Sequence, residues 1–278
     1  MKAIFISFAL ILLTTIAHSQ STAIRIEKRG KGSPVLFLPG FTTPGSVWNE
    51  TIKNLNMSRQ SIQVSYAGFN GITPIDTPWY PAIKAALLDY INKEKLTNLT
   101  IIGHSIGGSL AIEIAAALPL NVNKLILVDA IPCMRELMMP GVPASQIQYN
   151  NPYSNQQLKM GDEAFRQVAQ MMAGNMTNVA AKVDTLAQWM IDADRKTYVY
   201  GYTDLLKLDL RPLLEQVKAE TLILGASFPN AGQAKETFDK QYVKLNNKTI
   251  ELAPDSKHFV MLDQPLWFYE RVNAFMSK

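Results

Sequence analysis

The sequence predicts an α/β fold, in which a mostly parallel, doubly wound sheet carries a helical lid insertion. Three observations lead to this prediction. The chain has 278 residues, of which 47% are hydrophobic and 18% are charged, so it can bury the core of one large domain. Short apolar runs alternate with helical stretches, which is typical of a parallel sheet covered on both faces. Strand signals are missing between residues 132 and 211.

Residues 1–19 have the pattern of a secretory signal peptide. Lys2 precedes a short apolar run over residues 3–13, and the small-x-small triplet at residues 17–19 fits cleavage before Gln20. The run is too short to cross a membrane as a helix, and an apolar anchor helix is the alternative. The single cysteine, Cys133, lies far from this segment and excludes both a lipid anchor beside it and an intrachain disulfide. We therefore expect a secreted or periplasmic protein with no membrane span once the signal is removed.

Hydrophobic patterning predicts the elements of the core. Residues 24–27 alternate between apolar and polar side chains, as an edge strand does. Residues 35–38 and 99–102 are apolar or nearly so throughout, which is typical of strands buried on both faces. The same signals predict strands over residues 62–64, 124–128, 221–224 and 249–252, and helices over residues 47–55, 80–93, 106–118 and 265–275.

Residues 132–211 form the predicted lid, inserted between two parts of the core, residues 20–131 and 212–278. Helical periodicity dominates this stretch, which also holds Trp189 and eight of the twelve methionines. Methionine forms adaptable apolar linings, so a pocket between lid and sheet would favour a small or medium apolar acyl or alcohol group. Simple packing of the lid helices is the alternative explanation of the methionines.

Charge and motifs exclude several function classes. The net charge of +4 arises from scattered lysines and arginines, so we expect a small-molecule substrate and no nucleic-acid partner. Beyond the predicted signal only His104 and His258 remain as histidines, and with one cysteine they leave too few ligands for a zinc site. No phosphate-binding or dinucleotide-binding glycine motif occurs. We therefore expect no metal and no cofactor.

A G-x-S-x-G string, Gly103-His104-Ser105-Ile106-Gly107, stands between an expected strand and an expected helix. This context is typical of a nucleophile elbow. The serine of an elbow sits on a tight turn with strained dihedral angles, and the flanking glycines let strand and helix close without collision. The following helix points its N-terminus at the site, which favours developing negative charge. Because an elbow exposes only its serine, we expect His104 to pack away from the reaction centre. An ordinary glycine-rich turn is the alternative interpretation.

With this string, most of the chain beyond the signal resembles the α/β-hydrolase superfamily, in its serine-nucleophile branch with a helical lid. Residues 38–41 resemble the loop after the third core strand, although Pro39 stands where relatives often carry histidine. The resemblance implies an α/β-hydrolase fold and an oxyanion hole formed by the backbone N–H groups of Phe41 and Ile106. It also implies that His258, between the last predicted strand and helix, is the catalytic base. A histidine packed in the core is the alternative.

Asp129 is the preferred candidate for the acid of a catalytic triad. It ends a strand expected beside that of Ser105, so both side chains would project from the same carboxyl edge of the sheet. The order Ser105, Asp129, His258 matches the chain order of the family. Many relatives carry their acid after the seventh core strand, but residues 225–230 contain no carboxylate. A structural role for Asp129 is the competing interpretation. The other carboxylates considered as the acid are Asp255 and Asp263.

These residues favour a serine hydrolase, a carboxylesterase that acts on a small or medium apolar ester through an acyl-enzyme on Ser105. A serine nucleophile argues against the haloalkane dehalogenase and epoxide hydrolase branches of the family, which use aspartate. The alternative activities are those of an amidase, a lactonase, a cofactor-free haloperoxidase or a C–C bond hydrolase. A noncatalytic ligand-binding protein with the same fold is the alternative from a different class.

Overall fold

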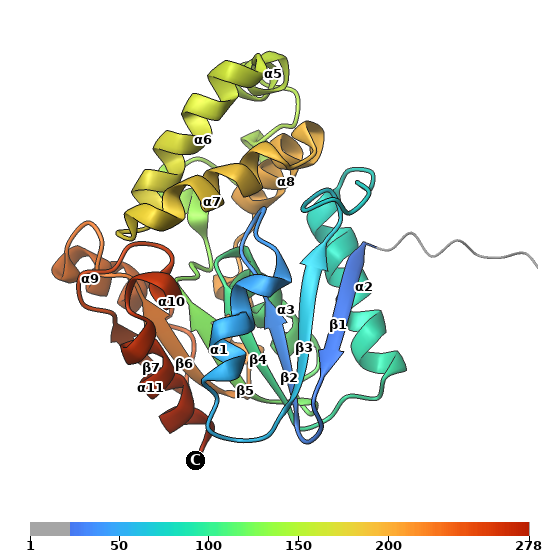
Figure 1. The fold of residues 1–278 in the computed structure, drawn as a ribbon, viewed down its shortest axis with the longest axis vertical. Coiled ribbons are helices and arrows are strands. Elements are labelled where there is room, and N and C mark those ends of the chain that lie inside the picture. The colour runs from blue at the N-terminus through green and yellow to red at the C-terminus, as the bar shows by residue number, and fades with distance from the viewer. Residues whose placement is uncertain (1–22, 278) are drawn as a thin grey trace, which may run out of the picture.

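A seven-stranded sheet organises residues 23–277, which are the residues that the computed structural model describes. The predicted signal peptide, residues 1–19, lies outside them. The strand order is β1-β3-β2-β4-β5-β6-β7; β1 runs antiparallel to β3, and all other neighbours run parallel. The strands are β1 (Ile24–Arg29), β2 (Pro34–Leu38), β3 (Gln60–Tyr66), β4 (Leu99–His104), β5 (Val122–Val128), β6 (Glu220–Gly225) and β7 (Lys248–Leu252). The predicted fold class is thereby confirmed (Figure 1).

Alternating side chains of the central strands supply the core on both faces of the sheet. In β2, Val35 and Phe37 join one buried cluster, whereas Leu36 and Leu38 join the other. Successive side chains of a strand point to opposite faces, so a strand with apolar residues at every position needs cover on both sides. The apolar run that predicted this strand therefore also predicted a two-sided sheet.

Helices cover the two faces. On the face of Leu36 pack α2 (Trp79–Lys93), α3 (Ile106–Ala117) and α9 (Ala231–Gln241); on the face of Phe37 pack α1 (Asn49–Lys53) and α11 (Pro265–Met276). The short helix α10 (Val260–Asp263) precedes α11, and 3-10 turns occupy Gly45–Trp48, Ala144–Gln146 and Arg211–Gln216. Neither α9 nor α10 was predicted from the sequence patterns.

The connection between β5 and β6 carries five helices: α4 (Met134–Met138), α5 (Pro152–Lys159), α6 (Asp162–Met176), α7 (Ala180–Ile191) and α8 (Arg195–Lys207). Residues 129–219, all of which the structure describes, contain no strand. Helices α5 to α8 lie beyond the end of the sheet at which the parallel strands finish (Figure 1). Two of them begin at side-chain caps, because Asn151 accepts from the Ser154 N–H and Asp194 from the Thr197 N–H. Across residues 23–277, no helix has both the length and the apolar character needed to cross a membrane.

Candidate active site

Ser105 occupies a strained turn between β4 and α3. Its backbone has φ 54° and ψ −122°, a conformation that side-chain-bearing residues rarely adopt. The turn requires the glycines beside it: a Cβ on Gly103 would collide with the Gly107 backbone, and one on Gly107 would lie 2.5 Å from the Pro39 carbonyl oxygen. Close approach of β2, β4 and α3 therefore holds the serine at the carboxyl edge of the sheet.

Gly107→Ala is expected to lower the free energy of unfolding by about 1–3 kcal/mol, because the added methyl group meets backbone atoms that cannot rotate away. Urea denaturation measures this change. Gly174→Ala is the matched control: a Cβ at Gly174, within α6, meets no atom within 4 Å. We expect this control to stabilise the protein by about 0.5–1 kcal/mol, as alanine does in a helix. Equal effects of the two substitutions would contradict the tight elbow.

Asp129 and His258 are joined by a short hydrogen bond. Asp129 follows β5, the neighbour of β4, and its Oδ2 lies 2.6 Å from His258 Nδ1. The other oxygen, Oδ1, accepts from the Ala226 N–H at 2.8 Å. A carboxylate only accepts hydrogen bonds, so Nδ1 carries the proton and Nε2 keeps a lone pair. The arrangement fixes the tautomer in which a histidine can act as a base.

His104 packs against the ring of His258. It is fully buried, its ring centroid lies 4.5 Å from that of His258, and its Nε2–H donates to the His258 carbonyl oxygen at 3.0 Å. Burial, and then the neighbouring His258, hold the pKa of His104 well below its ordinary value. This histidine is therefore neutral and supports the backbone of His258. Its ring is nevertheless part of the cavity wall described next, closer to the reaction centre than the sequence indicated.

Ser105 and His258 line one cavity of about 340 Å³ between the sheet edge and the lid. The floor includes residues 40–43 of the loop after β2. The lid supplies mainly apolar and aromatic side chains: Met134, Met138, Met172, Met176, Leu186, Trp189, Met190, Tyr198, Tyr202 and Leu205. Such a lining favours apolar groups. Among residues 23–277, no group of three His, Cys, Asp or Glu side chains is placed to hold a metal ion.

The two predicted oxyanion donors lie beside this cavity. Phe41 lines it, and Ile106 is the first residue of α3, where helical N–H groups have no partner within the helix. Neither N–H donates a hydrogen bond to another group within residues 23–277. Two hydrogen bonds hold the loop after β2 in place. The Tyr66 hydroxyl donates to the Pro39 carbonyl oxygen at 3.2 Å, and the Thr43 N–H donates to the Gly40 carbonyl oxygen at 3.2 Å. The two N–H groups therefore have no hydrogen-bond partner among the described residues.

Asp263 ties the loop of His258 to the lid. Its carboxylate accepts from the Thr177 hydroxyl at 2.5 Å, the Asn178 N–H at 2.9 Å and the Lys257 N–H at 2.8 Å. The Phe259 N–H adds a bond to the Met176 carbonyl oxygen at 3.0 Å. The loop is thus fixed on both sides of His258 to the turn between α6 and α7. Asp263 was considered as the triad acid; its hydrogen bonds go to this clamp and not to the imidazole.

Asp263→Asn is expected to lower the free energy of unfolding by about 1.5–3 kcal/mol, because its hydrogen bonds are made to a charged group. We expect a smaller loss of turnover, as the His258 loop loosens. Asp255→Asn is the matched control on the same loop, since Asp255 is exposed. Urea denaturation with a parallel ester assay separates the two variants. A large activity loss in Asp263→Asn at unchanged stability would instead indicate a direct catalytic role.

Sequence reasoning did not find the Ala226 N–H or the Asp263 clamp. Ala226 bonds to Asp129 across 97 positions and Asp263 to Thr177 across 86 positions of the sequence. Neither pair carries a local motif. The sequence of residues 225–230, which contains no carboxylate, gives no sign that the Ala226 N–H would bond to Asp129.

Comparisons with known proteins bear on the family and the fold of this chain. A model of the alpha/beta hydrolase family matches residues 35–271. A pimeloyl-[acyl-carrier protein] methyl ester esterase of Aeromonas hydrophila is 22% identical over 273 residues, covering 92% of this chain and all of the relative. An sn-1-specific diacylglycerol lipase of Danio rerio is 21% identical over 267 residues, covering 90% of this chain and 80% of the relative. The solved structure of an esterase from Exiguobacterium antarcticum superposes with a TM-score of 0.76 at 20% identity and covers 92% of this chain and 96% of its own.

Proposed function

Because this chain belongs to the alpha/beta hydrolase family, we propose that it is a serine carboxylesterase for apolar esters, with Ser105, His258 and Asp129 as its triad. One observation carries the proposal: Ser105 and His258 share an apolar cavity while Asp129 holds His258 Nδ1 at 2.6 Å. The esterases and the lipase among the similar proteins support the reaction class.

The proposed reaction has two acyl-transfer steps. The Ser105 oxygen attacks the ester carbonyl carbon while His258 Nε2 takes the hydroxyl proton, and the N–H groups of Phe41 and Ile106 stabilise the oxyanion. The bond to the alcohol oxygen then breaks, and this oxygen leaves with the proton from His258. A water molecule, deprotonated by His258, attacks the acyl-enzyme; its collapse returns the proton to Ser105 and releases the acid.

Apolarity of the cavity favours an ester over the alternative substrates. The lid lines it with five methionines, Trp189 and two tyrosines, and presents no charged side chain that would recognise a sugar or a charged peptide. An amidase, a lactonase, a haloperoxidase or a C–C hydrolase would use the same serine and histidine, so substrate comparison separates them. A noncatalytic binding protein has no need for a histidine held in its basic tautomer.

Hydrolysis of p-nitrophenyl butyrate and of the matching butyryl p-nitroanilide tests the proposal. The esterase function predicts steady release of p-nitrophenol from the ester and turnover of the anilide slower by about 10²-fold or more, since the amine is the poorer leaving group. Comparable rates on both would favour an amidase. No turnover of either ester or anilide by folded protein would contradict the enzyme and favour the binding protein.

The N-terminal pattern leads us to propose export of the chain. Expression of the full-length protein in a bacterial host, followed by fractionation and intact-mass measurement, tests this. A periplasmic product that begins at Gln20 is expected. Recovery of uncleaved chain in the cytoplasm would contradict export without affecting the esterase proposal.

A further inference from the structure

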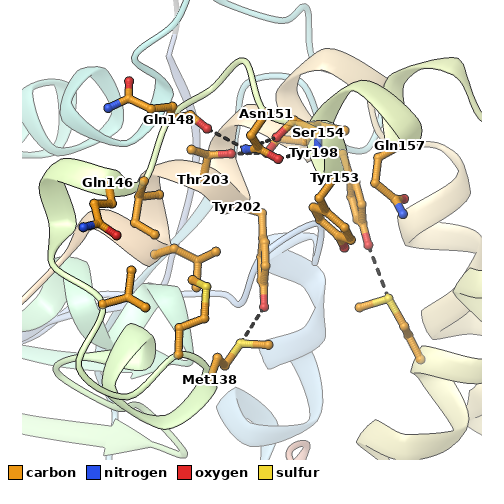
Figure 2. Close-up of a pocket in the computed structure, with 16 residues that line it drawn as sticks. Met138, Gln146, Gln148, Asn151, Tyr153, Ser154, Gln157, Tyr198, Tyr202 and Thr203 are labelled. Carbon is orange, nitrogen blue, oxygen red and sulfur yellow. Dashed lines mark hydrogen bonds between the residues drawn. The ribbon is translucent and has the colours of Figure 1, made fainter.

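A second chamber of about 530 Å³ lies within the lid, and Figure 2 shows the side chains that line it. Its lining comes mainly from α5, α8 and the segment between α4 and α5, with Met138 of α4 and Met172 of α6. Apolar side chains such as Val142, Ile147 and Val199 alternate with the uncharged polar groups of Gln148 and Asn151. None of the lining residues, all within the described part of the chain, carries a charge. The chamber is therefore built for an uncharged and largely apolar occupant.

One layer of side chains separates this chamber from the ester cavity. Met138, Met172, Tyr198 and Tyr202 line both spaces. The Tyr202 hydroxyl donates to the Met138 sulfur at 2.9 Å, a contact that Figure 2 shows, and that of Tyr198 donates to the Met172 sulfur at 3.5 Å. These four residues are called the partition below.

Within the partition, the side chains of Met138 and Met172 can move more easily than the two tyrosines. Tyr198 and Tyr202 pack on Phe41 of the oxyanion loop, with ring centroids 5.8 Å and 6.4 Å apart. Met138 is 56% exposed, and methionine has three rotatable bonds to swing about. A thioether is a weak hydrogen-bond acceptor, so breaking the tyrosine–sulfur contacts costs little. Movement of the methionines would join the two spaces without disturbing Phe41.

The position of His258 decides which half of an ester enters the chamber. The leaving alcohol takes its proton from His258, so it must lie on the imidazole side of the reacting carbon. His258 lines the ester cavity and a separate pocket beside Asp129 and Phe228, but it does not line the lid chamber. The acyl chain therefore points away from His258, towards the partition.

We propose that the lid chamber binds the distal part of a long, uncharged acyl chain, which passes the partition while its ester carbonyl lies at Ser105. The proposal rests on the proposed esterase function and specifies its substrate class. A terminal carboxylate would find no cation among the lining residues, so such acids are poor substrates. A terminal hydroxyl group can instead donate a hydrogen bond to the side-chain oxygen of Gln148.

Blocking the chamber with Val142→Trp tests the proposal. Val142 lines the chamber and not the ester cavity. Both of its hydrogen bonds are made by its backbone: its N–H donates to the Met139 carbonyl oxygen, and its carbonyl oxygen accepts from Arg135 Nε. Each buried methylene is worth about fourfold in kcat/KM. We expect Val142→Trp to lower kcat/KM for p-nitrophenyl decanoate by about tenfold or more, and to keep that for p-nitrophenyl butyrate within about twofold of the parent.

Ser145→Trp is the matched control, because Ser145 is exposed on the same segment and does not line the chamber. It should leave the ratio of decanoate to butyrate turnover unchanged. If Val142→Trp lowers butyrate turnover as well, Gln148→Trp, at an exposed lining position, replaces it as the blocking variant. Parent protein should also hydrolyse the decanoate at least about tenfold faster than the decanedioate monoester.

Three outcomes would overturn the proposal of an acyl-chain chamber. In each case the esterase function would still stand, provided that the protein hydrolyses the butyrate ester in a reaction that needs Ser105. The first is an unchanged decanoate-to-butyrate ratio in the blocking variant. The second is equal turnover of decanoate and decanedioate monoester. The third is that the blocking variant loses kcat/KM for decyl acetate, whose long chain is in the alcohol, but not for the decanoate. This result would mean that the chamber binds the alcohol part of the ester. Absence of turnover of every ester would instead reject the proposed function itself.

Discussion

Ser105→Ala and His258→Ala are each expected to lower turnover of p-nitrophenyl butyrate by about 10³-fold or more. Ser105 is the residue of the elbow turn that carries a hydroxyl at the cavity. Of the two histidines that line the cavity, His258 is the one that can serve as a base, since His104 is fully buried and bonded to the His258 carbonyl oxygen. Removal of either partner leaves no activated nucleophile. Steady-state assays of purified variants measure the loss.

Non-additivity gives the sharper test of this pair. The double variant should be little slower than either single variant, because a nucleophile and its base act as one unit. Ser109→Ala is a matched control, since Ser109 is a buried serine on α3 that does not line the cavity. It should keep turnover near that of the parent. Full activity in Ser105→Ala or His258→Ala would reject the assignment.

Asp129→Asn is expected to lower turnover by up to about 10⁴-fold while the protein stays folded. The amide oxygen can still accept from the Ala226 N–H, which preserves the packing of the side chain. Its NH₂ group would then face His258 Nδ1 as a donor, so the imidazole would move its proton to Nε2 and lose the lone pair that Ser105 needs.

Stability measurements separate this catalytic role from a structural one. Asp129 adopts φ 42°, which asparagine tolerates as well as aspartate does, so urea denaturation should still show a cooperative unfolding transition in Asp129→Asn, with a loss of no more than about 3 kcal/mol. Near-normal turnover in this variant, or a loss of turnover explained by unfolding, would indicate that Asp129 has a structural role and is not the acid of the triad. The large loss would then be sought in Asp263→Asn.

The strands and the strained turn at Ser105 were predictable because their signals are local. Strands β2 and β4 are buried on both faces, which demands continuous apolar runs, and the strained turn at Ser105 demands its glycines. Helix α9 was missed because only Ala234 and Phe238 of its eleven residues are apolar and buried, a stripe too thin to show as periodicity.

The site beyond Ser105 depends on contacts that no local pattern records. Adjacency of β4 and β5 made Asp129 a reasonable candidate, yet its hydrogen bond to His258 spans 129 positions of the chain. The packing of His104 beneath His258 and the clamp of Asp263 on the lid arise only when three separate segments meet. Long-range hydrogen bonds of this kind follow from the tertiary fold and carry no sequence motif.

The proposal that Ser105 is an activated nucleophile is tested most directly by labelling the protein with a fluorophosphonate and locating the modified residue by mass spectrometry. We predict a single stoichiometric adduct on Ser105, formed at least about 10²-fold more slowly in His258→Ala, because the probe reacts only with a serine whose proton is being removed. An unmodified protein, or an adduct on another serine while Ser105 stays free, would contradict the account.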